Sequence, residues 1–415
     1  MKLLYCCKKA GCLLLAVVML LGMFAGCDTT GTETTDGDTT TTAPEGTDTP
    51  ELKSYTVDDE TAVSVADQVV ATVGDRELTN GELQIYYWMG LYDYLATDTA
   101  YYLMYYYGVD FTQPLDTLVY NSETNTTWQD AMLEYCLENW HRYNALCLLA
   151  AEEGYVETEL DLDYLNSIEG NLQTMAENYS YENIRQMLDR EFGVGSTVEG
   201  FINYDYTVYL ALNYIDSLYE KLVPTQEELE TYFAENEETL ASSGITKETG
   251  DVVDVRHILI KPEGGTEDLE GHMVYTDEAW AACYQKALDI LEQWQEGEAT
   301  EFTFSVLANQ YSEDPGSNTN GGLYDGVTEG YMLEEFNDWI FDETRQYMDV
   351  DIVRTVHGYH IMFFAAREEA WVRTCKTMLV SDKINEIVEE ALEKYPATYD
   401  YDKMALSNVS LISEE

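Results

Sequence analysis

The chain has 415 residues, enough for two or three domains of ordinary size. It carries 21 Lys and Arg against 79 Asp and Glu, which gives a formal net charge of −58. This balance excludes a nucleic-acid footprint and docking on anionic lipid through a basic patch, since both need clustered cations. Because 45% of the residues are hydrophobic and 13% are aromatic, we expect folded cores and not a disordered polyanion.

The N-terminus predicts the cellular compartment. Residues 1–9 hold three Lys and no acid, and an apolar run over 10–25 follows, a pattern typical of a secretory signal peptide, here over 1–26. The run ends in Phe24-Ala25-Gly26-Cys27, which resembles a bacterial lipobox and implies lipidation of Cys27. Phe24 stands where Leu is usual, so an ordinary signal peptide with an incidental Cys is the alternative.

The residues after Cys27 predict a flexible tether over 27–64. Eleven of the 23 residues in 28–50 are Thr, and six are acidic. Such a segment cannot bury enough apolar area to offset the entropy lost on ordering. A lipidated Cys followed by a tether predicts a protein anchored to the outer face of the bacterial cell membrane.

Four cysteines follow Cys27, and we expect all four to be buried thiols: Cys136, Cys147, Cys283 and Cys375. A Cys283–Cys375 disulfide remains the alternative. There is no CxxC pair and no metal-type spacing, so the sequence predicts neither a metal site nor a cofactor.

Residues 65–223 predict a mostly helical domain. A short strand and hairpin are expected over 69–78, and Thr79 caps a following helix with Glu82 placed as in a capping box. Apolar residues recur at three- and four-residue spacing over four further stretches: 128–153, 157–178, 181–192 and 196–222.

Tyrosines gather in this domain, above all over 86–107 and 204–214. One interpretation is an amphipathic wall that holds unfolded chains, since Tyr offers apolar area, a polar tip and few torsions to freeze. The other is that the rings pack the helix cores, as a stripe at helical spacing usually does.

The remaining chain predicts a linker helix and connector over 224–251, an α+β domain over 252–368 and a C-terminal helix with its tail over 369–415. The linker helix starts at Pro224 and is expected to end near Leu240. Strands are expected from residue 252 and over 352–363, the latter as two strands or one bent strand, with helices at 277–296, 302–311 and 331–341. An amphipathic helix over 380–394 is expected to pack on the helical domain, and a free solvated helix is the alternative.

Five motifs in order carry a family resemblance. They are V-R-H-I-L-I at 255–260, F-x-x-L-A-x-x-Y-S-x-D-P-G-S at 304–317, G-G at 321–322, G-x-M-x-x-x-F at 330–336 and H-G-Y-H-I at 357–361. Over about 115 residues this region resembles the parvulin peptidyl-prolyl isomerase domain. The whole layout resembles secreted foldases of the PrsA and SurA type, though less strongly outside 252–368.

The resemblance implies the fold and the site. The fold would be α+β: a mostly helical chaperone-like domain, a parvulin domain with a small antiparallel sheet surrounded by helices, and a C-terminal helix. Met332 and Phe336 would grip the proline ring, with Tyr324 on the rim. The polar shelf would consist of four catalytic residues: His257, Asp314, Thr355 and His360.

The sequence departs from the family pattern beside this site. Members commonly read G-G-D-L-G-x-F, where this chain has Gly-Gly-Leu-Tyr-Asp-Gly-Val over 321–327, which puts the pocket shape in question. The basic cluster that selects phosphorylated Ser/Thr–Pro is replaced by an acidic loop after Lys261, so a phosphate would be repelled.

Together these features predict an extracytoplasmic isomerase and foldase. Its partners would be unfolded or partly folded secreted polypeptides with X–Pro bonds, together with the membrane through the lipid anchor, and no nucleic acid. Two alternatives remain: a catalytically weak holdase with a vestigial parvulin domain, and a surface lipoprotein with an adhesive or structural role.

Overall fold

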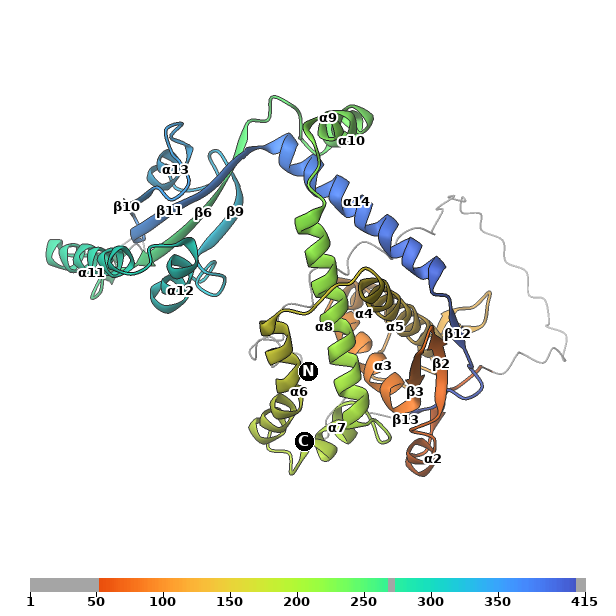
Figure 1. Ribbon diagram of the computed structural model, residues 1–415. Helices are drawn as coiled ribbons and strands as arrows, with labels where there is room; N and C mark the ends of the chain where they lie inside the picture. The colour runs from red at the N-terminus through yellow and green to blue at the C-terminus, as the bar shows by residue number, and fades with distance from the viewer. Residues whose placement is uncertain (1–51, 268–272, 408–415) are drawn as a thin grey trace, which may run out of the picture. The chain divides into compact units, whose positions relative to one another are not determined.

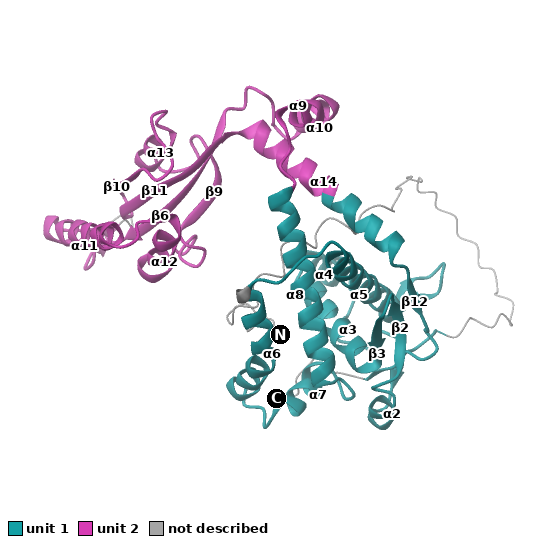
Figure 2. Cartoon of the chain, in the orientation of Figure 1, with its two compact units in different colours: residues 1–221, 384–415 teal, residues 222–383 magenta. Residues whose placement is uncertain are grey.

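The computed structural model describes residues 52–267 and 273–407, and it divides the chain into two compact units (Figures 1 and 2). Unit 1 combines the chain up to Lys221 with the segment from Ile384 onward, and unit 2 spans Leu222–Lys383. The signal peptide, Cys27 and the tether as far as residue 51 lie outside the described residues and remain predictions. Over 52–64 the predicted flexible tether is wrong, because this segment contains a strand paired with the C-terminal part of the described chain and a short helix, and Tyr55 is buried. Within the described ranges, no helix has the length and apolar character needed to cross a membrane.

Unit 1 contains the predicted hairpin and the helix that follows it. After the short helix α2 (Asp59–Ser64), strand β2 (Val69–Val73) pairs antiparallel with β3 (Arg76–Thr79). The Thr79 hydroxyl caps α3 (Asn80–Leu95) by accepting a hydrogen bond from the Glu82 amide at 3.3 Å. The predicted role of the Glu82 carboxyl in a capping box is wrong: the carboxyl is buried and hydrogen-bonds Asn203.

The other four predicted helices are confirmed to within three residues at each end: α5 (Trp128–Glu152), α6 (Glu159–Asn178), α7 (Ile184–Glu191) and α8 (Val198–Lys221). Thr127 and Thr158 start α5 and α6 with reciprocal capping boxes. Helix α8 packs against α3, α5 and α6. The sequence analysis missed α4 (Asp98–Tyr107) and the hairpin of β4 (Val119–Asn121) and β5 (Thr126–Thr127).

The tyrosines differ in burial from helix to helix, and the core-packing interpretation is confirmed for four of them; that tyrosines hold unfolded chains stays a prediction. The rings that face the core of α3 and α8 are buried: Tyr86, Tyr87, Tyr204 and Tyr214. The rings of α4 are exposed: Tyr101, Tyr102, Tyr105, Tyr106 and Tyr107. These tyrosines of α3 and α8 therefore pack in the core, whereas those of α4 lie on the surface.

The C-terminal helix is longer than predicted. Helix α14 (Ala370–Lys394) starts directly after a strand, with the Ala370 amide donating to the Gly250 carbonyl at 2.9 Å. Beyond it, β12 (Ala397–Tyr399) pairs with β2, and β13 (Leu406–Ser407) pairs with β1 (Thr56–Val57). The end of the described chain thus contributes to the small sheets of unit 1.

Unit 2 begins with two short helices where the sequence predicted one. Helix α9 (Gln226–Glu235) ends at Asn236, and α10 (Glu237–Ser242) follows. The single-helix prediction is wrong because Asn236 leaves the helical conformation, with φ −115°, and its side-chain amide donates to the Tyr232 carbonyl at 2.9 Å.

A four-stranded antiparallel sheet organises unit 2 in the order β10-β11-β6-β9. Its strands are β6 (Asp251–Ile260), β9 (Leu323–Thr328), β10 (Val350–Thr355) and β11 (Gly358–Glu369). The region over 352–363 is therefore two strands. The accompanying helices are α11 (Asp277–Glu296), α12 (Glu301–Tyr311) and α13 (Glu334–Phe341). The short strands β7 (Thr266–Glu267) and β8 (Met273–Val274) pair antiparallel. The predicted α+β class is confirmed.

The sheet of unit 2 separates two hydrophobic cores. On β11, Ile361 and Phe363 join the core with α11 and α12, whereas Met362 and Phe364 join the core with α13. Alternate residues of a strand point to opposite faces, so the two cores lie on opposite faces of the sheet. The four cysteines after Cys27 are free and buried, which confirms the thiol prediction over the disulfide alternative.

Candidate active site

Two histidines meet on the α13 face of the sheet. His257 lies on β6 and His360 on the neighbouring strand β11, at positions that alternate with the residues of the α11 and α12 core. Their Nδ1 atoms are 2.9 Å apart, and the rings are stacked with centroids 5.1 Å apart and an interplanar angle of 18°. Both side chains are buried, so the contact is shielded from water.

The contact between the two Nδ1 atoms holds a single proton, because one nitrogen must donate and the other accept. Burial, and next the electrostatic influence of the neighbouring His257 imidazole, lower the pKa of His360 to about 3, so His360 is neutral at physiological pH. Its Nε2 lies 2.8 Å from the Thr355 hydroxyl, whose oxygen also accepts from the His357 amide at 3.1 Å. Thr355 can therefore donate to His360, His360 to His257, and His257 through Nε2–H to Asp314.

Asp314 ends this chain as a carboxylate surrounded by donors. Its Oδ2 accepts from the Ser317 hydroxyl at 2.6 Å, the Tyr324 hydroxyl at 2.9 Å and His257 Nε2 at 3.0 Å. These bonds, led by that from His257, hold the pKa of the Asp314 carboxyl well below its usual range. Asp314 is therefore a fixed anion, and its crowded oxygen is poorly placed to act as a nucleophile.

Glycines make room for this arrangement. A Cβ on Gly322, which has φ +72°, would lie 2.3 Å from the His257 carbonyl oxygen. The Gly322 carbonyl in turn accepts from the His257 amide at 2.8 Å, which fixes the loop on the strand. A Cβ on Gly316 would lie 2.7 Å from the Tyr324 hydroxyl, so Gly316 opens the space through which Tyr324 reaches Asp314.

An aromatic wall stands beside the polar chain. Phe336, on α13, lies edge-on to His257 and to His360, with ring centroids 5.4 Å apart in both pairs. Met332 is half-buried against the same core, and Tyr331 beside it is exposed. The predicted helix start at residue 331 is wrong, because α13 begins at Glu334, so Met332 lies in the turn before the helix.

The structure thus brings the seven predicted site residues of unit 2 to one face of the sheet. Hydrogen bonds link the four shelf residues and Tyr324, and Phe336 and Met332 form the apolar side. Sequence analysis missed Ser317, which is fully buried and bonds Asp314 and His257. Its signal was present, since Ser317 closes the motif that contains Asp314.

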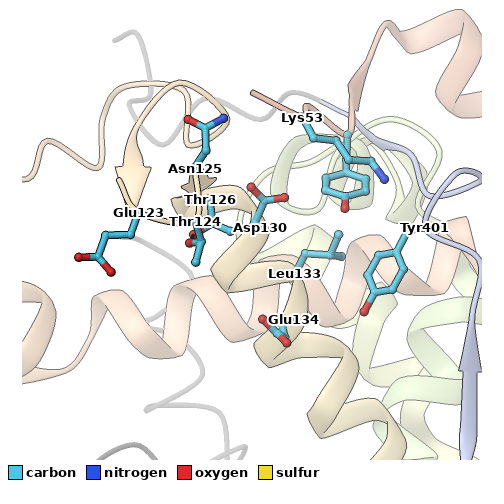
Figure 3. Close-up of a pocket in the computed structure, with 10 residues that line it drawn as sticks. Lys53, Glu123, Thr124, Asn125, Thr126, Asp130, Leu133, Glu134 and Tyr401 are labelled. Atoms are coloured by element: carbon cyan, nitrogen blue, oxygen red, sulfur yellow. Dashed lines mark hydrogen bonds between the residues drawn. The ribbon is translucent and has the colours of Figure 1, made fainter. Parts of the chain in front are cut away.

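A separate hollow in unit 1 has a different character (Figure 3). It lies between the β4–β5 turn, the start of α5 and Tyr401, and the carboxylates of Asp130 and Glu134 line it. Lys53 Nζ lies 4.7 Å from the ring centroid of Tyr55 and 5.8 Å from that of Tyr401. Because a proline ring needs apolar walls, this polar hollow fits it less well than the face that carries Phe336.

Comparison with known proteins agrees with this geometry. Residues 240–367 match the family model described as the PPIC-type PPIASE domain. Chaperone SurA of Pseudomonas syringae pv. tomato is 35% identical over 112 residues, 27% of this chain and 22% of that protein. Foldase protein PrsA 3 of Bacillus cereus is 34% identical over 98 residues, 24% of this chain and 31% of that protein.

A longer match covers more of the chain at lower identity. Foldase protein PrsA of Halalkalibacterium halodurans is 27% identical over 214 residues, 49% of this chain and 51% of that protein. The chain thus spans between 22% and 51% of the length of these curated relatives. Residues 240–367 belong to the PPIC-type PPIase domain family, the parvulin type, in a chain similar to the PrsA foldases and SurA chaperones.

Proposed function

We propose that this chain is a peptidyl-prolyl cis–trans isomerase that assists the folding of secreted polypeptides. The observation that carries the proposal is the hydrogen-bonded chain from Thr355 to Asp314 beside the Phe336 ring, on one face of a parvulin-type sheet. Rotation about an X–Pro bond has a barrier of roughly 18–20 kcal/mol and takes tens to hundreds of seconds unaided. No bond need be made or broken.

The geometry supports a noncovalent mechanism. Phe336 and Met332 hold the proline ring against an apolar surface, which excludes water from one side of the amide. The polar chain presents fixed dipoles that favour the twisted amide over the planar one. Asp314 maintains the orientation of His257 through the Nε2 contact, and Thr355 does the same for His360.

The charge of the chain favours neutral or basic substrates. Residues 252–368 contain 24 acidic and six basic residues, so a phosphorylated or acidic segment would be repelled across the whole domain. Two of these acidic residues, Glu263 and Glu267, are exposed in the described part of the segment after Lys261. We therefore propose unfolded polypeptides with unmodified X–Pro bonds as substrates.

The signal sequence and Cys27 support a place outside the cytoplasm. A basic start, a short apolar run and the lipobox-like Phe24-Ala25-Gly26-Cys27 fit a lipid-anchored protein on the outer face of the cell membrane. Labelling with a radioactive fatty acid tests the anchor: the wild-type protein should incorporate label, and Cys27→Ser should not. Equal incorporation by both would remove Cys27 as the lipidation site.

The isomerase is tested with a proline peptide and the full chain. His257→Ala and Met332→Ala should each lower kcat/KM, the first by removing the centre of the polar chain and the second by opening the apolar wall. His141→Ala, which replaces a histidine of unit 1, is the matched control and should retain wild-type activity. Unchanged activity in His257→Ala and Met332→Ala would remove the assigned site.

A further inference from the structure

Helix α4 exposes aromatic side chains along most of its length. Tyr101, Tyr105 and Tyr106 are 66%, 70% and 66% exposed, and Tyr102, Met104 and Tyr107 are also exposed. Among the residues of α4, Ala100 alone is buried. We call the exposed rings of Tyr101, Tyr102, Tyr105, Tyr106 and Tyr107 the α4 tyrosine face.

The rings of this face contact one another. Tyr101 stacks on Tyr105 with centroids 5.9 Å apart and an interplanar angle of 11°, and Tyr102 and Tyr106 lie 4.7 Å apart. Tyr105 and Tyr106 meet edge to face at 4.9 Å, so the rings form one continuous patch. Contiguous exposed apolar surface of this kind marks interaction sites in soluble proteins.

The stretch of sequence that contains the face is negatively charged. Residues 77–141 contain ten Asp and Glu and no Lys or Arg. The ring face of a tyrosine attracts a cation, and the attraction is strongest for guanidinium and ammonium groups close to the ring centre. Aromatic surface in an acidic field therefore favours a ligand that has both cationic groups and apolar contact area.

Cations of this chain already use the same contact elsewhere. The Arg354 guanidinium lies 4.0 Å from the Trp280 ring centroid, and Lys247 Nζ lies 4.7 Å from that of Trp371. None of the cation–ring contacts among the described residues involves a ring of α4, so a cation on these rings would come from a ligand in solution.

We propose that the α4 tyrosine face binds Arg- or Lys-bearing segments of unfolded polypeptides. The proposal deepens the foldase function and rests on it for the nature of the partner. Electrostatic repulsion disfavours two other ligands, a second copy of the chain and the chain's own tether. Two copies with net charge −58 repel each other, and residues 28–50 of the tether contain six acidic and no basic residues. An extended basic segment is attracted by the field and stacks its side chains on the rings.

Binding of labelled peptides to the full chain tests the proposal. The probe is a short unstructured peptide of Gly and Ser with several Arg, and the reference has Glu in place of each Arg. Neither contains Pro, so the isomerase domain has no X–Pro bond to hold. The wild-type chain should bind the Arg peptide at low salt, bind it several-fold more weakly at high salt and leave the Glu peptide free.

The variant Tyr101→Gln/Tyr105→Gln/Tyr106→Gln tests the face itself. Gln is a good helix former, so the helix should persist, which circular dichroism checks. Removing three rings should weaken binding of the Arg peptide about tenfold. The control Tyr219→Gln, which removes an exposed tyrosine of α8, should bind as the wild-type chain does.

Three results would overturn the proposal. They are equal affinity of the wild-type chain and the triple variant for the Arg peptide, equal affinity of the wild-type chain for both peptides, and a concentration-dependent dimer that the triple variant abolishes. The proposed isomerase is measured separately with a proline peptide, and the triple variant should retain that activity. Failure of Arg-peptide binding with isomerase activity intact would therefore contradict the binding proposal alone, and the reverse result would contradict the isomerase proposal alone.

Discussion

The two units each bury an ionisable side chain in its neutral form, but with opposite consequences for pH. In unit 1, burial raises the pKa of Glu82 to about 8, and Asn203 is its hydrogen-bond partner. In unit 2, burial lowers the pKa of His360 to about 3, and His360 has partners at both ring nitrogens. The buried acid stands at the start of a helix, whereas the buried base is one link of a hydrogen-bonded chain that ends at Asp314 and lies beside an apolar wall.

This difference indicates what each buried group does. The folded state of unit 1 keeps the Glu82 carboxyl protonated and neutral, so ionisation of Glu82 destabilises the unit. Unit 2 places its neutral imidazole between Thr355 and His257, where the fixed dipoles serve the proposed reaction. Unit 1 should therefore lose stability as pH rises, and unit 2 as pH falls.

The largest effect is expected from breaking the polar chain at its anion. Asp314→Ala leaves the donors of His257, Ser317 and Tyr324 without their shared acceptor, and it should lower kcat/KM on a proline peptide about 100-fold. Asp314→Asn keeps one acceptor oxygen, so its kcat/KM should lie between those of Asp314→Ala and the wild-type chain. Equal activity of Asp314→Ala and the wild type would contradict a role for the polar chain.

The next effect is on the stability of unit 1. The folded pKa of Glu82 lies above its unfolded value, so the folded state binds more protons and stability falls as pH rises from about 4.5 to 8. Between pH 5 and 7 the loss should be about 2 kcal/mol. Glu82→Gln should remove most of this slope, as measured by hydrogen exchange of peptides from α3 and α8. A smaller slope should remain, because burial raises the pKa of Asp93 on α3 to about 6. A slope of unchanged size in Glu82→Gln would place its source elsewhere.

In unit 2 the dependence of stability on pH is expected to have the opposite sign. The folded pKa of His360 lies below the unfolded value, so the unfolded state binds more protons and stability falls as pH drops below about 6.5. Between pH 7 and 5 the loss should be about 1–2 kcal/mol. His360→Gln should flatten this dependence in hydrogen exchange of peptides from β6 and β11. If His360→Gln instead steepened it, the neutral assignment of His360 would be wrong.

The smallest effect concerns Tyr324, where the chain departs from the family pattern. Tyr324→Phe keeps the ring 5.3 Å from His257 but removes one donor to Asp314, so kcat/KM should fall about fivefold. Tyr284→Phe, which removes an exposed hydroxyl on α11, is the control and should have no effect. A tenfold gain in Tyr324→Phe would show that the hydroxyl obstructs the site.

Local pattern predicted the parts of the fold that local interactions determine. The bounds of α11 match the expected 277–296, because Thr276 caps it and its apolar residues keep helical spacing. Helix α4 was missed because its run of tyrosines has no alternation of polar and apolar residues to mark a helix. The break at Asn236 and the late start of α13 depend on backbone conformations that spacing does not encode.

The site was predictable in identity but not in detail. The motifs identified His257, Asp314 and His360, which the structure joins in one chain. The contact from Tyr324 on β9 to Asp314 could not be predicted, because it depends on the missing Cβ of Gly316 in the turn that contains Asp314. Tertiary contacts of this kind have no signature in the spacing of either residue.

Exchange spectroscopy by NMR on an Ala–Pro peptide tests the central claim most directly. At catalytic concentration, the full chain should bring cis–trans exchange from tens or hundreds of seconds into the range of seconds or less. The double variant His257→Ala/Asp314→Ala, with circular dichroism to verify folding, should leave the exchange at its unaided rate. A wild-type chain that leaves the exchange unchanged, or a double variant as fast as wild type, would contradict the account.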